Sequence, residues 1–237
     1  MNETIDSILI AFSLITNKED YLVEIVILSL RVSLFATFYA SILGLGLAAL
    51  LAVFKIPGKF LMVAVINGFL GLPPVVVGLF LYLMLSKNGP LNFLELLYTP
   101  GAMILAQTIL ITPVITALSY EILKSANEEY FDQLSTLGAS KIIISGTILW
   151  ESRYSLLTVV VAGFGRAVGE VGAVMIVGGN INHLTRVMTT AIALETSKGN
   201  LTFALALGIV LIFISLSINF LLVGLRLKAS LVEGKKL

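Results

Sequence analysis

The chain has 237 residues, of which 58% are hydrophobic and only 12% are charged. This balance excludes an ordinary soluble domain and indicates a polytopic, all-α membrane protein with one transmembrane domain over residues 1–237. The formal net charge of +1 is uninformative, because the charges lie in loops and must be read by position. The sequence contains no cysteine, which excludes disulfides and thiolate metal sites.

Five apolar segments are long enough to cross a bilayer, which takes about 20 residues. In chain order they cover residues 32–54, 60–86, 96–120, 154–177 and 199–225. The first helix is expected to begin near Tyr21 and to include Arg31. Residues 5–15 are apolar but too short to span, so they predict an interfacial helix before the spans.

Basic residues are distributed unevenly between the two sets of loops. Nine follow spans one, three and five, whereas four lie in the other loops. The nine are Lys55, Lys59, Lys124, Lys141, Arg153, Arg226, Lys228, Lys235 and Lys236, and the four are Lys18, Lys87, Arg186 and Lys198. The positive-inside rule therefore predicts an external N-terminus, a cytoplasmic C-terminus and a cytoplasmic loop at about residues 123–153.

Within that loop, residues 127–151 form a polar stretch between apolar spans. Tyr130, Leu134 and Leu137 have the i, i+4, i+7 spacing of one apolar helix stripe. Gly138 stands where a left-handed C-cap is expected, and Ser140 can then N-cap a second helix. The pattern predicts two short helices joined by a turn, which is suited to docking a soluble partner.

The second span contains the consecutive prolines Pro73 and Pro74, followed by Val75. Two prolines remove two backbone donors, so the helix must break or kink there. One interpretation is a kink that serves packing alone. The other is that the bend lines a translocation path near its gate, because broken helices at membrane depth usually face protein or water.

The fourth span contains two ionisable residues, Arg166 and Glu170. Their i, i+4 spacing predicts an ion pair on one helix face, and charges inside a membrane usually pair and face the bundle interior. A structural pair and a role in the path both stay open. His183, the single histidine, is expected to be solvated in an external loop, and no transition-metal site is expected.

Several motifs are absent from the sequence. It has no Gly-x-x-x-x-Gly-Lys-Ser/Thr string, so the chain is not expected to hydrolyse ATP by a P-loop. Glu170 is the single acid well inside a span, so no carboxylate relay for proton coupling is visible. We therefore expect no catalytic residue and no cofactor, and we expect a partner to supply the energy.

The loop resembles the cytoplasmic coupling loop of ATP-binding-cassette (ABC) importer permeases. That family's pattern is Glu-Ala-Ala, three residues, Gly, nine residues, Ile-x-Leu-Pro. Asp132 takes the Glu place, Gly138 the Gly place and Ile148 the Ile place, whereas Trp150 and Glu151 replace Leu-Pro. The resemblance implies that the ATPase-coupling residues are Asp132, Gln133, Leu134, Leu137, Gly138, Ala139 and Ser140.

Two further segments are similar to the molybdate, tungstate and sulfate group of these permeases. They are Leu72-Pro73-Pro74-Val75-Val76-x-Gly78 and Arg166-x-x-Gly169-Glu170-x-Gly172-Ala173. The five-span form and the sequence around residues 71–79 look most like the tungstate branch. The candidates for the path and its gate are Pro73, Pro74, Val75, Arg166 and Glu170.

The resemblance implies a type I importer fold and alternating access in a prokaryotic plasma membrane. Two copies of the chain would pair, two cassette ATPase subunits would grip the coupling loops, and an external solute-binding protein would deliver an oxyanion, with tungstate expected. The lipid bilayer is the other partner, and no nucleic acid is expected. The alternatives are import of molybdate, sulfate or another anion, and an ion-coupled secondary transporter or channel.

Overall fold

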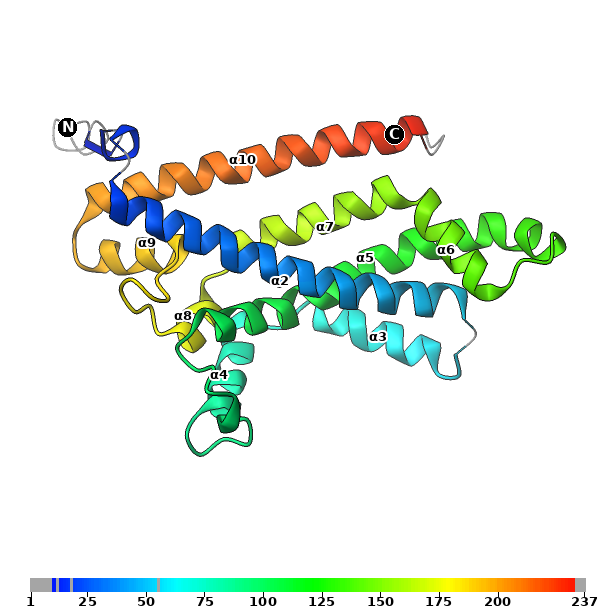
Figure 1. The fold of residues 1–237 in the computed structure, drawn as a ribbon, viewed down its shortest axis with the longest axis horizontal. Helices are drawn as coiled ribbons and strands as arrows, with labels where there is room; N and C mark the ends of the chain where they lie inside the picture. The colour runs from blue at the N-terminus through cyan, green and yellow to red at the C-terminus, as the bar shows by residue number, and fades with distance from the viewer. Residues whose placement is uncertain (1–9, 12, 18, 55, 233–237) are drawn as a thin grey trace. The chain divides into compact units, whose positions relative to one another are not determined.

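The computed structural model describes residues 10–11, 13–17, 19–54 and 56–232. Its elements in chain order are α2 (Asp20–Val53), α3 (Lys59–Phe69), α4 (Pro74–Leu85), the 3-10 helix η1 (Asn92–Leu94), α5 (Pro100–Thr136), α6 (Lys141–Glu151), α7 (Arg153–Val168), α8 (Gly172–Gly178), α9 (Met188–Ser197) and α10 (Leu201–Val232) (Figure 1). No strand occurs in the described ranges, so the predicted all-α fold is confirmed.

Helices α2, α5 and α10 are each long and apolar enough to cross a membrane. Two bent pairs, α3 with α4 and α7 with α8, bring the candidate spans to five if each pair forms one span. These five follow the order of the five predicted segments. Helix α2 begins at Asp20 and contains Arg31, as expected.

The predicted segments outside the spans have different outcomes. Of the predicted interfacial helix, residues 5–9 and 12 lie outside the described residues, and the described part of it is helical. The segment at residues 178–200, predicted to be an external loop, holds a helix of its own, α9, which the sequence analysis missed. Four of the counted basic residues also lie outside the described residues: Lys18, Lys55, Lys235 and Lys236.

The chain divides into two compact units. Unit 1 combines Met1–Ala36, Pro73–Gln107 and Arg166–Ser217. Unit 2 combines Thr37–Leu72, Thr108–Gly165 and Ile218–Leu237. Helices α2, α5 and α10 each contribute residues to both units. The single transmembrane domain expected from the sequence stays a prediction.

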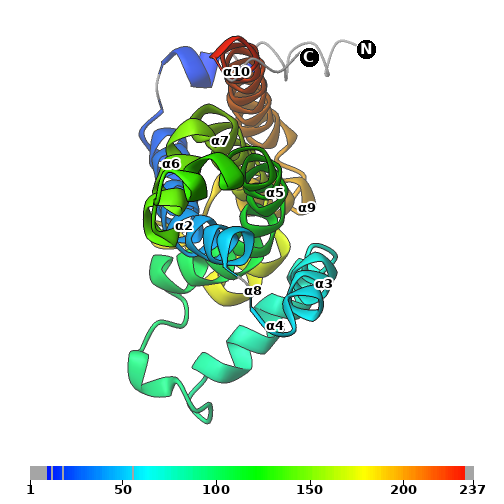
Figure 2. The ribbon, with the colours of Figure 1, turned by 90° about the vertical axis from the view of Figure 1, so that its right-hand side faces the viewer.

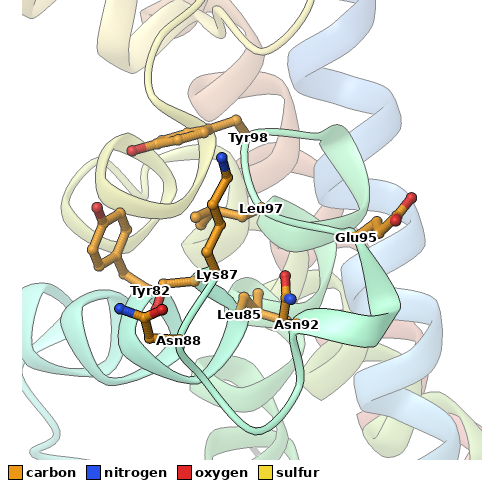
Figure 3. A pocket seen from close by; sticks show the side chains of 9 residues that line it. Tyr82, Leu85, Lys87, Asn88, Asn92, Glu95, Leu97 and Tyr98 are labelled. Carbon is orange, nitrogen blue, oxygen red and sulfur yellow. The ribbon is translucent and has the colours of Figure 1, made fainter.

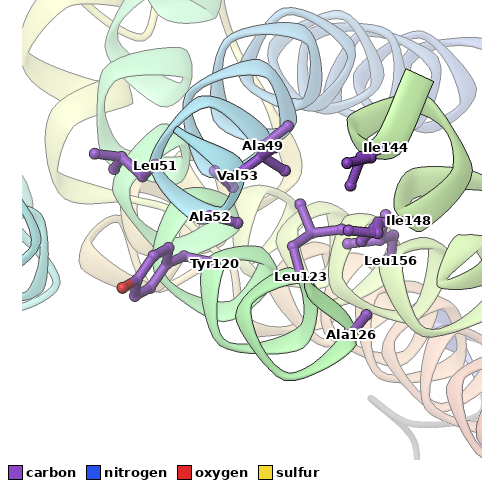
Figure 4. Packing of buried hydrophobic residues seen from close by; sticks show 11 residues of the cluster. Ala49, Leu51, Ala52, Val53, Tyr120, Leu123, Ala126, Ile144, Ile148 and Leu156 are labelled. Carbon is purple, nitrogen blue, oxygen red and sulfur yellow. The ribbon is translucent and has the colours of Figure 1, made fainter. Parts of the chain in front are cut away.

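The apolar core of unit 2 lies where α2, α5, α6 and α7 meet (Figure 2, Figure 4). Small side chains on α2 let the neighbouring helices approach closely. The buried members are Ala48, Ala49, Leu51, Ala52, Val53, Tyr120, Leu123, Ala126, Ile144, Ile148 and Leu156. This core ties the loop helix α6 to the membrane-crossing helices of its unit.

In unit 1, α4 and α8 pack against each other at glycines (Figure 1). A Cβ atom on Gly78 would lie 2.8 Å from the Cα atom of Ala173, and one on Gly172 would lie 2.8 Å from Cγ2 of Val75. Because neither glycine has a Cβ, the two short helices approach to backbone distance. The segments that follow the two helix breaks are thereby in contact.

Candidate functional site

The turn between α5 and α6 is a glycine-capped helix end. Gly138 has a φ of +78°, in the left-handed region that favours glycine. The Ala139 N–H donates to the Leu134 carbonyl at 3.0 Å, and the Gly138 N–H donates to the Ser135 carbonyl at 3.0 Å. These two bonds are the pair that defines a Schellman motif. The predicted left-handed cap at Gly138 is confirmed.

Ser140 starts α6 with a side-chain cap. Its backbone is extended, and its hydroxyl accepts a hydrogen bond of 3.4 Å from the Ile143 N–H. This satisfies one of the donors that a helix start leaves without partners. The predicted N-cap is confirmed, and hydrogen bonds close both ends of the turn.

The prediction that the first of the two helices is short and separate is wrong. This helix does not stand alone, because α5 continues without a break to Thr136. Residues 121–136 contain neither glycine nor proline, so nothing in the sequence stops the helix before Gly138. Tyr130 and Leu134 are half-buried against the core of unit 2, but Leu137 lies past the helix end. Leu137 therefore does not continue their stripe.

The turn and α6 present apolar side chains to the outside of the unit. Leu137 is 83% exposed, Ile142 78% and Trp150 66%. On the opposite face of α6, Ile144 and Ile148 are buried in the core (Figure 4). Asp132 and Gln133 are also exposed, on the last turns of α5. The arrangement is an exposed surface of apolar and polar groups, and the opposite face of α6 is anchored in the core.

Pro73 and Pro74 lie at the start of α4. Neither residue has a backbone N–H, so α3 cannot run on through them, and α3 ends at Phe69. Pro74 occupies the first position of α4, where the missing donor costs nothing. The predicted break is confirmed. Val75, in the next position, packs on Gly172 of α8.

The predicted ion pair between Arg166 and Glu170 is wrong. Helix α7 ends at Val168, so the two residues are not on one helical face. They form no ion pair in the part of the chain that the structure describes. Glu170 Oε1 instead accepts a hydrogen bond of 3.3 Å from the Ala173 N–H, at the start of α8. Arg166, in the last turn of α7, is exposed.

A small cavity lies beside the α7–α8 break. Its polar lining comes from Ser29, Ser33, Gln107, Glu170 and Thr189. Gln107 Nε2 donates to the Ala167 carbonyl at 3.0 Å, and the Thr189 hydroxyl donates to the Glu170 carbonyl at 2.8 Å. The Ala167 carbonyl also accepts from the Glu170 N–H at 3.2 Å, so the two side chains add hydrogen bonds to backbone carbonyls at the interruption between α7 and α8. Sequence analysis missed Gln107, although it stands out as a polar amide in an uncharged span.

The loop after α8 is hydrogen-bonded to the start of α2. His183 Nδ1 lies 2.7 Å from Glu24 Oε2, so this histidine is not simply solvated as predicted. Arg186 hydrogen-bonds the Tyr21 hydroxyl and the Asn180 carbonyl. No sequence pattern links these positions, because more than 150 residues separate the partners of each pair that involves α2.

A chain that is helical through its described elements, with up to five of them long and apolar enough to cross a membrane, belongs to the class of polytopic membrane proteins. Residues 40–228 match the family described as binding-protein-dependent transport system inner membrane component. The match covers well over half of the chain, so the chain belongs to this family. The predicted membership in the permeases of these importers is thereby confirmed.

Similar proteins include permeases for several anions. A probable anion ABC transporter permease protein of Haloferax volcanii is 41% identical over 206 residues, covering 85% of this chain and 89% of the relative. A tungstate uptake system permease protein of Peptoclostridium acidaminophilum is 40% identical over 216 residues, covering 91% and 95%. A sulfate transport system permease protein of Salmonella typhimurium is 30% identical over 206 residues, covering 82% and 74%.

Proposed function

We propose that this chain is the permease subunit of an ATP-driven importer that carries tungstate into the cell. The observation that carries the proposal is the 40% identity to a tungstate uptake permease over nearly the full length of both chains. The five candidate spans supply the membrane part. The capped turn at Gly138 supplies a contact through which a soluble subunit can move the permease.

The partner that docks on this turn is a cassette ATPase, one on each of two permease chains. The exposed Leu137 and Ile142 give it an apolar contact. The buried Ile144 and Ile148 transmit its movement to the core of unit 2. This chain then supplies no catalysis, and the ATPase hydrolyses ATP. Lys59, Lys124 and Lys228 agree with a cytoplasmic location of this end under the positive-inside rule.

The proposed dimer and translocation path follow from the number of spans and the positions of the helix breaks. Five spans are too few to enclose a path, so two copies pair about a two-fold axis. The path is lined near the breaks at Pro73–Pro74 and at Glu170, with Val75 and Arg166 as further candidates. An external solute-binding protein delivers the anion, the N-terminus faces outward, and the C-terminus lies in the cytoplasm of a plasma membrane.

A second candidate is import of another tetrahedral oxyanion. The 30% identity to a sulfate permease and the 41% identity to a probable anion permease favour this alternative. Sulfate and molybdate share the shape and double charge of tungstate. Within this scheme the solute-binding protein mainly selects among these anions. The permease sequence therefore contains little information about the substrate.

The test is uptake into vesicles that contain the permease and its ATPase, with the solute-binding protein outside and ATP inside. We expect tungstate to accumulate, as measured by elemental analysis, and accumulation to stop without ATP. Competition with sulfate and molybdate ranks the anions. Preferential sulfate uptake would replace the substrate and keep the class. Accumulation driven by a proton or sodium gradient without ATP would overturn the ATP-driven mechanism.

A further inference from the structure

A cavity of about 700 Å³ opens between the end of α4 and the start of α5 in unit 1. The chain reverses there through a tight turn, in which the Gly89 N–H donates to the Ser86 carbonyl at 2.8 Å. A Cβ atom on Gly89 would lie 2.2 Å from the Leu83 carbonyl oxygen, so this turn needs a glycine. Under the predicted orientation the cavity lies on the external side of the membrane. No step of the proposed function uses it.

Hydrogen-bond donors dominate the polar lining of this cavity. Lys87, Asn88 and Asn92 have no side-chain partner in the described parts of the chain, so their ammonium and amide groups are available to a ligand. Glu95 is the single acid of the lining. Figure 3 shows the Lys87 side chain rising toward Tyr98, whereas the Glu95 carboxylate points away to the other side.

Two tyrosines form the wall above Lys87. The rings of Tyr82 and Tyr98 lie 6.3 Å apart, centroid to centroid. The neighbouring Tyr82 side chain raises the pKa of the Tyr98 phenol, and burial raises it further. The Tyr98 hydroxyl therefore keeps its proton at neutral pH. Each protonated phenol has one hydrogen that it can donate to a ligand.

Tyr98 is held in a strained conformation that fixes its ring over the cavity. Its φ is +61°, which is costly for a residue with a Cβ atom. Its N–H donates to the Val177 carbonyl at 3.0 Å, and its ring lies against Gly179, where a Cβ would come within 2.7 Å. Strain of this kind persists where surrounding contacts enforce it and is common at ligand sites. The contact also connects the cavity wall to the end of α8.

We propose that the cavity walled by Tyr82, Lys87 and Tyr98 is an entry site that binds a free tetrahedral oxyanion. This inference rests on the proposed function. It adds a site that the anion occupies after the solute-binding protein releases it and before it reaches the helix breaks. One lysine with neutral donors binds a dianion weakly, which suits transport because a tight site would trap the ion. Lysine acts on phosphate-like groups as a point charge, without requiring a fixed geometry.

The test is equilibrium dialysis of the purified permease–ATPase complex against tungstate, in detergent and without the solute-binding protein. We expect saturable, millimolar binding that weakens at least tenfold in Lys87→Met and falls several-fold in the conservative Tyr98→Phe variant. Lys198→Met is the matched control, because Lys198 also lies in an external loop but already pairs with Glu195 at 3.0 Å. Unchanged binding in Lys87→Met, or no saturable binding by the wild type, would overturn the entry site.

Two further measurements test the nature of the ligand and the link to transport. Lipid phosphates have the same tetrahedral chemistry, so loss of tungstate binding on addition of phosphatidylglycerol would assign the cavity to a headgroup and overturn the free-anion site. ATP-dependent uptake by the wild type is measured in parallel. Normal uptake without cavity binding removes the entry site and keeps the transport function. Cavity binding without ATP-dependent uptake of any oxyanion overturns the transport function instead.

Discussion

Gly78 of α4 lies directly against the backbone of Ala173 in α8, where a Cβ atom at position 78 would come within 2.8 Å of the Ala173 Cα atom. Such a distance leaves no room for a methyl group between the two helices. The contact joins the segment after the Pro73–Pro74 break to the segment after the Glu170 break. A movement of one of these short helices must therefore involve the other.

The first prediction concerns this contact. Gly78→Ala should destabilise the protein by about 1–3 kcal/mol, because an inserted methyl forces helix displacement in a close-packed site. The measurement is thermal unfolding of the purified chain together with the uptake rate. Gly68→Ala is the control, since a Cβ there meets nothing within 4 Å. Equal stability of the Gly78 variant and the wild type would mean that the helices separate easily.

The second prediction concerns the coupling turn. Gly138→Ala should cost about 1 kcal/mol in the turn, because a residue with a Cβ is disfavoured at a φ of +78°. The distorted turn should retain less ATPase on co-purification and transport less anion per ATP hydrolysed. Gly146→Ala, in the middle of α6 with open space around it, should keep both properties. Full coupling in the Gly138 variant would argue against a strict turn geometry.

The third prediction separates the two faces of the loop. Leu137→Ser should change the free energy of unfolding by less than about 0.5 kcal/mol, because the side chain is exposed. It should nevertheless reduce ATPase retention. Ile148→Ala should instead destabilise by about 2–5 kcal/mol, because it opens a cavity in the core. Undiminished ATPase binding by the Leu137 variant would place the docking contact elsewhere.

The fourth prediction follows from the absence of an ion pair between Arg166 and Glu170 in the described structure. Without a shared partner, their substitutions should act independently and add within about 0.5 kcal/mol. The uptake rates of Arg166→Gln, Glu170→Gln and the double variant test this relation. Rescue of either single variant by the second substitution would show that the two charges pair in some state of the transport cycle.

The fifth prediction concerns Glu195 in α9. Burial raises the pKa of this carboxyl group, but hydrogen bonds from Lys198 and Asn200, together with the positive charges of Lys198 and Arg186, outweigh burial and leave the pKa below its usual value of 4.5. The ionised carboxylate therefore contributes stability above that value, and the contribution is lost as the pH falls through the lower folded-state pKa. Glu195→Gln should be less stable than the wild type at pH 7, and the gap should close under strong acid. A pH-independent gap in unfolding temperature would contradict this origin.

Local sequence signals predicted the features that depend on neighbouring residues alone. The cap at Gly138 and the N-cap at Ser140 were predicted because each depends on a few adjacent backbone groups. The break at Pro73 and Pro74 was predicted because a missing N–H cannot be compensated within the helix. The ion pair of Arg166 and Glu170 failed for a related reason. The i, i+4 rule assumes an unbroken helix, and the glycines at 169 and 172 allow the helix to end in this segment.

The sequence by itself determined the membrane class, the order of the spans, the proline break, the glycine cap and the family of the chain. Each of these follows from hydrophobic length, backbone chemistry or a short motif. Only the tertiary structure showed that Gly78 meets Ala173, that Gln107 binds the Ala167 carbonyl, and that His183 pairs with Glu24. These contacts join residues far apart in the chain, and their energies depend on which helix faces pack together, which a local pattern does not contain.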